Sequence, residues 1–336
     1  MRALLSVASR DGITGFARGL QAQGVEVYAT DGTREHLAQD GVEARPVAEL
    51  TGSPAFLGGQ VKTFHPAIYA GILARRDRPD QLAELDAQGI GPIDLVAVNV
   101  KPFGAEVGKR AVAIDQAVEM IDGGGAALLS AAARNAAGVT VVPSPEHYPK
   151  VLAELKDRGL VSAELRAKLA AEAFATIAAY HAEIAAYLNQ LTSTTYPNRL
   201  AMVLEKVTDL GYGENPHQTA AFYRETTHRT GTLADATQLQ GGAPTFNNLL
   251  DLDAAYRVAS DFTTPTVCIS KHTDPVGIAT ADDLVEGYRR AVDTDPVASF
   301  GAIVAVNRTL DGPTAREIVA SSYEAVIAPG FDDSAV

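Results

Sequence analysis

The sequence predicts an α/β protein whose first part is organised around a parallel sheet. Residues 3–7 are apolar, residues 13–23 have the apolar period of an amphipathic helix, and residues 25–29 are a second apolar run. This βαβα start implies parallel strands joined by right-handed crossovers. Residues 93–100 and 139–142 are further apolar strands that lead into polar loops. Because ligands of such sheets bind at the carboxyl ends of the strands, functional side chains are expected there.

A glycine triplet opens a helix between the last two of these strands. Asp122 and the three glycines after it precede a helical pattern over residues 126–135. Glycine lets a backbone approach an anion closely. The triplet lacks the spacing of the dinucleotide-binding and Walker motifs, so it is a weak signal by itself. Alanine- and leucine-rich helices are expected at residues 146–158 and 163–190.

The rest of the chain is expected to form one further α/β unit. Apolar runs and helical patterns alternate in it, which predicts strands with helices packed on them. In order, they are strand 220–223, helix 251–261, strand 266–269, helix 282–292, strand 302–306, helix 314–320 and strand 325–328. The third of these is followed by a polar loop at residues 270–275, and the helix before it begins after Asn247 and Asn248.

Length and composition are those of a globular protein of two domains. Of 336 residues, 46% are hydrophobic and 21% are charged, which excludes a disordered or fibrous chain. We expect a first domain at residues 1–191, a linker at 192–200 and a second domain at 201–336. With 41 acidic and 28 basic residues the formal charge is -13, so binding to nucleic acid is not expected. An anionic ligand must be held by a local cluster of cations and helix N-termini.

Cysteine and histidine usage excludes several kinds of site. Cys268 is the only cysteine, so the sequence allows neither an intrachain disulfide nor a thiolate-rich metal site, and a reducing cytosol fits. The seven histidines have no paired spacing such as HExxH, so no metal is expected, and His147 and His181 are interpreted as packing or surface residues. No stretch has the character of a signal peptide or of a membrane span, so we expect a cytoplasmic protein without membrane contact.

Residues 211–218 form a loop that is rich in functional groups. The run has neither the strand nor the helix period, and Pro216 biases the residue before it away from helical geometry. Tyr212, Asn215 and His217 bring a phenol, an amide and an imidazole together, beside a carboxylate. Such a loop is a usual place for a ligand, although a polar turn between domains would have the same composition.

Ordered motifs in both halves resemble those of one enzyme family. They are residues 61–63, His65-Pro66, Pro102-Phe103, Ile121-Asp122, Ala132-Ala133 before Asn135, residues 213–218, Asn247-Asn248, Lys271-His272-Thr273 and residues 327–330. The set resembles AICAR transformylase/IMP cyclohydrolase, the bifunctional purine enzyme, over essentially the whole chain. The resemblance implies an N-terminal methylglyoxal-synthase-like parallel-sheet domain, followed by one cytidine-deaminase-like α/β unit of a transformylase domain.

The resemblance implies two reactions on a phosphorylated purine-precursor nucleotide. A formyl group passes from the co-substrate 10-formyltetrahydrofolate to the 5-amine of aminoimidazole carboxamide ribonucleotide, and the formamide then closes on the carboxamide with loss of water. No tightly bound cofactor is implied, and relatives act as homodimers. For the first reaction, His272 can relay a proton while the Lys271 ammonium stabilises an oxyanion, and Tyr212, His217 and Asn247 would bind substrate.

For ring closure, the family pattern assigns a nucleotide clamp and a catalytic group. Because closure is intramolecular, holding the reacting groups in near-attack geometry supplies most of the acceleration. The clamp implied by the resemblance comprises Ser6, Arg10, Thr30, Gly32, Thr33, Lys62 and Thr63, with Gly124 and Gly125 as further substrate-binding residues. Asn99, Asp122, Lys101 and Arg134 are expected to surround the base, with Lys62, Asp122, Lys101 and Arg134 as catalytic residues.

Several site positions depart from the family pattern. Lys101 stands in place of a tyrosine and Arg134 in place of a lysine, so hydrogen-bonding and proton-donating capacity changes. Gln60 and Gly211 each replace an arginine. Asp31 occupies a glycine position in the phosphate turn, where it would either repel a phosphate or cap the helix that follows. Asp274 and Val276 replace Asn and Cys.

Three hypotheses for function remain open at this point. The first is a purine enzyme in which ring closure is better supported than formyl transfer, because relatives continue into a further half that supplies folate contacts. The second is a non-catalytic module that binds a phosphorylated nucleoside or metabolite. The third is an enzyme acting on a related amide-bearing nucleotide in a specialised pathway, with Lys101 and Asp31 reshaping the pocket.

Overall fold

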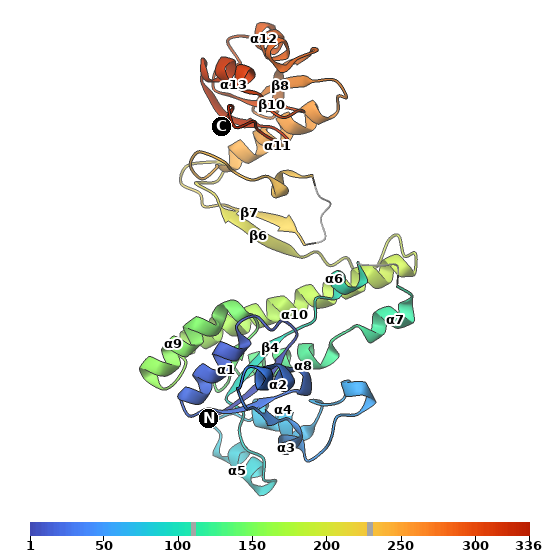
Figure 1. The fold of residues 1–336 in the computed structure, drawn as a ribbon, viewed down its shortest axis with the longest axis vertical. Helices are drawn as coiled ribbons and strands as arrows, with labels where there is room; N and C mark the ends of the chain where they lie inside the picture. Colours follow the sequence, from blue (N-terminus) through green and yellow to red (C-terminus); the bar gives the residue numbers. More distant parts are fainter. Residues whose placement is uncertain (109–111, 227–230) are drawn as a thin grey trace. The chain divides into compact units, whose positions relative to one another are not determined.

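The computed structural model describes residues 1–108, 112–226 and 231–336. They form two compact units, unit 1 at Met1–Ala201 and unit 2 at Met202–Val336. Unit 1 contains a five-stranded sheet, and unit 2 contains a four-stranded sheet and a two-stranded sheet. Figure 1 labels the main helices and strands of each unit.

The sheet of unit 1 is parallel throughout and has the order β3-β2-β1-β4-β5. Its strands are β1 Arg2–Val7, β2 Glu26–Ala29, β3 Arg45–Pro46, β4 Leu95–Asn99 and β5 Thr140–Val142. In the central strand β1, Leu4 lies opposite Tyr28 on one side and Val96 on the other. Most of β1 and β4 is buried, as the near-continuous apolar runs of a parallel sheet require. The predicted parallel α/β fold is therefore confirmed.

Helices pack on this sheet and build the unit 1 core. They are α1 Ile13–Ala22, α2 Asp31–Gln39, α3 Ala48–Thr51, α4 Pro66–Leu73, α5 Pro79–Ala87, α6 Phe103–Val107, α7 Ile114–Glu119, α8 Gly123–Arg134, α9 Tyr148–Arg158 and α10 Ala163–Leu191, with short 3-10 turns at Leu57–Gly59 (η1) and Pro145–His147 (η2). The Ser162 hydroxyl caps the long helix α10 by accepting a hydrogen bond from the Leu165 N–H (3.2 Å). Further along α10, Tyr180 and Ile184 pack with Phe103 of α6 in a separate apolar cluster.

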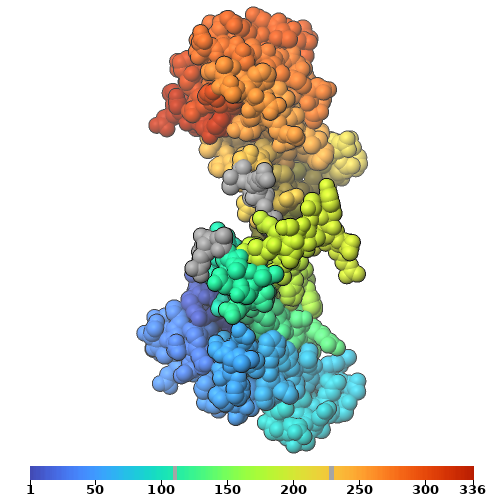
Figure 2. Space-filling view, turned by 90° about the vertical axis from the view of Figure 1, so that its right-hand side faces the viewer, coloured from blue at the N-terminus to red at the C-terminus, as the bar shows by residue number. Residues whose placement is uncertain are grey.

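Helices α4 and α8 lie side by side and run in the same direction. Thr63, just before α4, lies near Gly124 in the first turn of α8. At the other end, the Asn135 amide donates hydrogen bonds to the carbonyls of Ile72 (2.7 Å) and Ala74 (3.1 Å). The two helices therefore begin at the same edge of the unit. In the space-filling view, the blue to cyan segments that include α4 and α5 form a continuous face of unit 1 (Figure 2).

Unit 2 is a mixed four-stranded sheet with helices on both faces. Its elements are β6 Leu204–Asp209, β7 Ala221–Glu225, η3 Leu233–Asp235, α11 Phe246–Ser260, β8 Thr266–Lys271, β9 Asp274–Thr280, α12 Leu284–Thr294, β10 Ala302–Val306, α13 Gly312–Val319 and β11 Tyr323–Ile327. The main sheet has the order β11-β10-β8-β9, in which β10 and β11 are parallel and the other pairs antiparallel. One core cluster includes Val267, Leu284 and Ile318, and another includes Ala255 and Ile303. Hence α12 and α13 cover one face and α11 the other.

Two sequence expectations in unit 2 are wrong in detail, and one strand was not expected. The loop expected at residues 270–275 is instead a tight hairpin between β8 and β9. Helix α11 begins at Phe246, not at 251, because Thr245 and Asn248 cap it reciprocally, with the Asn248 N–H donating to the Thr245 hydroxyl (3.2 Å). Strand β6 was not predicted because all of its residues are exposed and it has no buried face.

None of the described helices combines the length and the apolar character that a membrane span requires.

Tyr148 couples the stability of unit 1 to alkaline pH. Its ring stacks on Phe16 with centroids 4.2 Å apart, and burial, with a smaller effect of the Asp11 charge, raises the pKa of Tyr148 to about 12. An unfolded tyrosine titrates near pH 10. The stabilisation is therefore present below about pH 10 and is lost as the pH rises through about 12. Between about pH 10 and pH 12, urea melts should show that the unfolding free energy of Tyr148→Phe falls less steeply with pH than that of wild type. The control Tyr196→Phe changes a tyrosine that is 92% exposed, and its unfolding free energy should follow that of wild type.

Candidate functional site

The carboxyl edge of the unit 1 sheet gathers several helix N-termini. Helices α1 and α2 are the first elements after β1 and β2, and α8 begins at this edge because it leads into β5, which runs parallel to β4. Helix α4 begins beside α8. The free N–H groups and the dipole of a helix attract an anion to its N-terminus. The edge therefore offers a local positive potential in a chain of net charge -13.

Asn99 shapes the turn that follows β1. Its side-chain oxygen accepts hydrogen bonds from the backbone N–H groups of Ala8 (2.6 Å) and Ser9 (2.8 Å). Asn99 ends β4, the neighbour of β1, so these bonds join the two strand ends. Both lone pairs of the amide oxygen are used in this way. Asn99 was expected beside the base, and in the structure it positions the turn that carries Arg10.

Arg10 lies across the two turns that were predicted to form the phosphate clamp. Its Nη1 donates hydrogen bonds to the Val7 carbonyl and to the Thr33 hydroxyl (2.8 Å). Thr33 is buried and its hydroxyl also accepts from the Val7 N–H (3.2 Å). A Cβ on Gly32 would lie 3.2 Å from Nη2 of Arg10, so glycine leaves the space in which the guanidinium lies. Desolvation lowers the pKa of Arg10 from its usual value, and arginine remains charged at neutral pH.

The other clamp residues of this edge lie around the same turns. The Thr30 hydroxyl donates to the Ser6 hydroxyl (3.3 Å), which links the end of β2 to β1. Thr30 is the N-cap residue of α2, so Asp31, which could have capped that helix, is its first residue and is exposed. The interpretation of Asp31 as an N-cap is therefore wrong. A carboxylate in this first turn already interacts favourably with the helix dipole.

Asp122 caps the glycine-rich start of α8. Its Oδ1 accepts a hydrogen bond from the Gly125 N–H (2.8 Å), and its own N–H donates to the phenol oxygen of Tyr180 (2.6 Å). Thr63 reaches the same place, because its Oγ1 lies 3.4 Å from where a Cβ of Gly124 would be. The structure thus brings Asp122, Thr63, Gly124 and Gly125 together, as the site prediction requires. Tyr180 was not predicted, since its position in a long amphipathic helix gives no functional signal.

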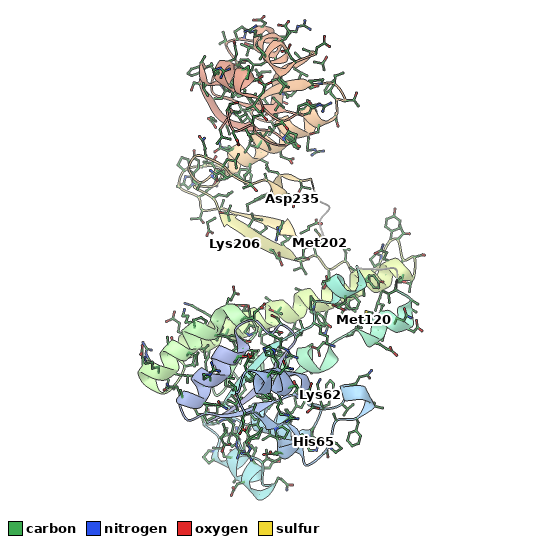
Figure 3. The ribbon with its side chains drawn as sticks, viewed as in Figure 1. Lys62, His65, Met120, Met202, Lys206 and Asp235 are labelled. Atoms are coloured by element: carbon green, nitrogen blue, oxygen red, sulfur yellow. The ribbon has the colours of Figure 1, made fainter. Side chains whose placement is uncertain are left out.

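The two candidate lysines of unit 1 are exposed. Lys62 directly precedes Thr63, and Lys101 follows the end of β4 by two residues. Neither ammonium forms an ion pair within the described part of the chain, so both remain available to a ligand. Figure 3 shows Lys62 and His65 in the segment that leads into α4. His65 is the N-cap residue of that helix, its Nδ1 accepting from the Ala67 N–H (3.2 Å).

Arg134 lies away from the other candidate catalytic residues of unit 1. It is the last residue of α8, and Asp122 is the N-cap residue at the other end of that helix. Twelve residues at 1.5 Å per residue correspond to about 18 Å along the helix axis. The expectation that Arg134 and Asp122 surround the same base is therefore not met within one chain. Arg134 is exposed at the opposite end of the helix.

In unit 2, helix α11 and the residues just before it hold the loop at residues 211–218. The Gly211 N–H donates to the Pro244 carbonyl (3.0 Å), the Phe246 N–H to the Tyr212 carbonyl (3.2 Å), and the Asn247 side-chain amide to the Glu214 carbonyl (3.3 Å). Tyr212 and His217 are exposed, so their side chains are accessible to a ligand. The structure therefore brings Asn247 to the loop with which it was predicted to act.

Lys271 and His272 lie at the hairpin between β8 and β9. Lys271 pairs with Asp274 across a two-residue turn in which His272 and Thr273 have φ of 54° and 67°. The Lys271 ammonium donates to the Phe300 carbonyl (2.8 Å), whereas the His272 side chain is exposed. The left-handed conformation is unfavourable for a β-branched residue and costs on the order of 1–3 kcal/mol. Asp251 of α11 accepts from both turn N–H groups, and no sequence motif had singled it out.

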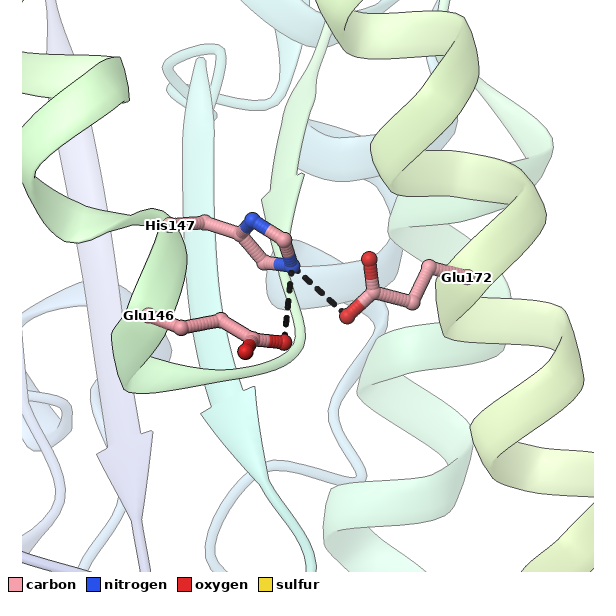
Figure 4. Close-up of side chains that lie close together, drawn as sticks. All are labelled: Glu146, His147 and Glu172. Atoms are coloured by element: carbon pink, nitrogen blue, oxygen red, sulfur yellow. Dashed lines mark hydrogen bonds and ion pairs between the residues drawn. The ribbon is translucent and has the colours of Figure 1, made fainter. Parts of the chain in front are cut away.

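One histidine and two carboxylates outside these sites form a polar cluster, shown in Figure 4. The Nε2 of His147 lies 2.6 Å from Oε1 of Glu172 and 3.5 Å from Oε1 of Glu146. A separation of 2.6 Å is that of a direct hydrogen bond, which ties the start of α9 to α10. His147, interpreted as a packing or surface residue, is partly buried and makes this contact. The cluster lies on a different pair of elements from the candidate site.

Comparison with known proteins supplies the family. Residues 132–336 match the profile of the AICARFT/IMPCHase bienzyme, and residues 12–127 match the MGS-like domain. The chain belongs to the AICARFT/IMPCHase bienzyme family. Its similarity to the bifunctional purine biosynthesis protein PurH of Rhodopirellula baltica is 44% identity over 99% of this chain and 64% of that protein. PurH of Bacillus cereus is 42% identical over 100% of this chain and 66% of that protein. PurH of a Cyanothece species is 46% identical over 99% of this chain and 66% of that protein.

The family match also assigns the fold of the N-terminal part. Residues 12–127 match the MGS-like domain and include strands β2, β3 and β4 of the unit 1 sheet, so the methylglyoxal-synthase-like domain expected at the N-terminus is confirmed. The chain spans about two thirds or slightly less of the length of these curated relatives, 64% of one and 66% of the others. A crystal structure of ForH has 37% sequence identity to this chain and a TM-score of 0.49. The match covers 55% of this chain and 96% of the ForH chain.

Proposed function

We propose that unit 1 binds a phosphorylated purine-precursor nucleotide and closes formylated aminoimidazole carboxamide ribonucleotide to inosine monophosphate. The observation that carries this proposal is the group of helix N-termini at one sheet edge, with Lys62, Thr63 and Asp122 beside them. Helix N-termini and a lysine bind a phosphate, which this substrate carries. Relatives that match the whole chain are named as bifunctional purine biosynthesis proteins, which supports the substrate class.

The ring-closing step needs little beyond positioning and proton transfer. The carboxamide nitrogen attacks the formyl carbon, and a C–N bond forms. The carboxamide nitrogen and the formamide nitrogen each lose one proton, and the formyl oxygen receives two. Its C–O bond then breaks to release water as the C=N bond of the new ring forms. Asp122 Oδ1 accepts from the Gly125 N–H, and we assign Oδ2 as the acceptor for the proton of the carboxamide nitrogen. Lys101 supplies the positive charge beside the formyl oxygen, because Lys62 is assigned to the phosphate. Clamping the ribose phosphate places the two groups in near-attack geometry.

Formyl transfer has weaker support in this chain. Lys271, which would stabilise the oxyanion, donates to the Phe300 carbonyl, and Gly211 stands where relatives have an arginine. We therefore propose slow or absent turnover with 10-formyltetrahydrofolate as the co-substrate of unit 2. Nucleotide binding at Tyr212, His217 and Asn247 is proposed to persist, because α11 holds the loop with these residues.

Asp31 favours a second candidate, an enzyme for a related amide-bearing nucleotide. Its exposed carboxylate lies in the first turn of α2, beside the proposed clamp. Two like charges about 4 Å apart repel by about 4 kcal/mol at an effective dielectric constant near 20. A substrate with less negative charge near α2 would avoid this repulsion. Asp31→Gly should therefore tighten the binding of inosine monophosphate if the clamp accepts a phosphate, and leave it unchanged if the phosphate binds elsewhere.

An ultraviolet assay with formylated aminoimidazole carboxamide ribonucleotide and calorimetry with inosine monophosphate test the main proposal. Lys62→Ala should weaken binding by about 10- to 100-fold, the value of a hydrogen bond to a charged group. Lys168→Ala, on an exposed lysine of α10 that pairs with Glu164, is the matched control and should bind as wild type does. Wild-type protein that neither turns over the formylated nucleotide nor binds the product would contradict the proposal.

A homodimer working in the cytosol is proposed from the family alone. Light scattering of the purified chain tests the dimer, and a monomeric mass at micromolar concentration would contradict it.

A further inference from the structure

The turn that carries His272 has a backbone conformation that its own residues do not favour. Lys271 and Asp274 are paired, which leaves His272 and Thr273 as the two central residues, with φ of 54° and 67°. Two-residue hairpins of this kind usually have Asn, Asp or Gly at these positions. Threonine is β-branched and rarely adopts positive φ. The turn therefore needs support from outside the hairpin.

Asp251 provides this support from the neighbouring helix α11. Its carboxylate accepts hydrogen bonds from both central N–H groups of the turn, from Thr273 at 2.6 Å and from His272 at 3.3 Å. A carboxylate is a strong acceptor for backbone N–H groups. One side chain thus holds both residues whose backbone is unfavourable.

The same helix also holds the loop at residues 211–218. Asn247, four residues before Asp251, donates to the Glu214 carbonyl, and the Phe246 N–H donates to the Tyr212 carbonyl. Residues four apart lie on the same face of a helix. One face of α11 therefore contacts both segments that carry the candidate groups of unit 2, and it sets the distance between them.

We propose that Asp251 is a positioning residue, which holds the turn so that the His272 imidazole stands at a set distance from Tyr212 and His217. The inference rests on the proposed nucleotide binding of unit 2, which it deepens. In this role Asp251 acts through the turn and is not assigned a contact with the substrate. Removing it lets the turn adopt other backbone conformations, and His272 then leaves the place at which it meets a bound aminoimidazole carboxamide ribonucleotide.

Backbone NMR of the full chain tests whether Asp251 holds the turn. In Asp251→Ala the amide signals of His272 and Thr273 should shift and broaden, while the signals of the β8 interior stay in place. Asp251→Asn keeps an acceptor oxygen and should give a smaller change. Asp253→Ala is the control, because Asp253 is also on α11 and only approaches Arg257 (3.7 Å). Turn signals in Asp251→Ala that coincide with those of wild type would overturn the proposal.

Rescue separates positioning from general stability. Glycine adopts positive φ readily, so Thr273→Gly should make the turn independent of Asp251. In calorimetry with aminoimidazole carboxamide ribonucleotide, Asp251→Ala should weaken binding about tenfold, and Asp251→Ala with Thr273→Gly should bind within about threefold of wild type. A double variant as weak as the single one would overturn the positioning role. Wild-type protein that does not bind this nucleotide would refute the proposed function of unit 2, whereas the amide signals would still decide the role of Asp251.

Discussion

Gly277→Ala is expected to destabilise unit 2 by about 3 kcal/mol and to lower its melting temperature by about 10 °C. Gly277 is a buried residue of β9, and a Cβ there would lie 2.0 Å from the Ala291 carbonyl oxygen and 2.9 Å from the carbonyl carbon. These atoms belong to the backbone of α12, so no side-chain rotation relieves the contact. The whole helix must move by on the order of 1 Å, although Leu284 and Tyr288 pack it into the core.

Calorimetric melts together with amide exchange of β8 and β9 measure this effect in the intact chain. Gly242→Ala is the control, since a Cβ there has no neighbour within 4 Å and its φ is not positive, and it should change stability by less than about 0.5 kcal/mol. Because domains have only about 5–15 kcal/mol of stability, the loss in Gly277→Ala is a large fraction of the total. If Gly277→Ala has the same melting temperature as the control variant, α12 does not lie on β9 in the way the structure places it.

The central strands could be predicted from the sequence because burial on both faces leaves a clear apolar signal. Residues 3–7 and 302–306 are such runs, and both are strands in the structure. Strand β9 was missed because Pro275 and Gly277 lower the strand propensity of its seven residues. The two-residue edge strand β3 contains Pro46 and gives no periodic signal at all.

The candidate site was predictable to the level of which turns take part, and less so for individual side chains. Parallel strands bring their carboxyl ends together, so the turns after β1 and β2 had to meet. A sequence pattern does not show hydrogen bonds between turns. Asn99 was therefore expected beside the base, whereas its side chain accepts hydrogen bonds from the N–H groups of Ala8 and Ser9. The separation of Arg134 from Asp122 follows from the helix rise alone. It was not predicted because both residues lie in motifs that the family resemblance assigns to one base.

Asp251 shows the kind of residue that motifs miss. Its four-residue spacing from Asn247 was visible in the sequence, but the expected helix started only at position 251, so the two residues were not placed on one face. Capping by Thr245 and Asn248 extends the helix and produces that face. An error of five residues in a helix boundary was therefore enough to hide the link between the two motifs of unit 2.

Gly125→Ala is expected to reduce ring closure by about 100-fold while leaving the stability of unit 1 nearly unchanged. A Cβ on Gly125 would lie 2.7 Å from Oδ2, 3.0 Å from Cγ and 3.1 Å from Oδ1 of Asp122. The carboxylate must rotate away, and the cap that it forms with the Gly125 N–H is lost. Losing the cap costs about 1 kcal/mol, and replacing glycine by alanine inside a helix gains about 0.5–1 kcal/mol, so the two effects nearly cancel.

This combination separates the site from the fold. The ultraviolet assay, calorimetry with inosine monophosphate and a thermal melt on the same preparation give activity, affinity and stability together. Gly123→Ala is the matched control from the same triplet, because a Cβ there meets only Phe64 at 4.0 Å, an ordinary van der Waals contact. It should retain both binding and turnover. A Gly125→Ala protein that closes the ring at the wild-type rate would show that the capped position of Asp122 is not the reactive one, and that the proton of the carboxamide nitrogen is accepted elsewhere on the sheet edge.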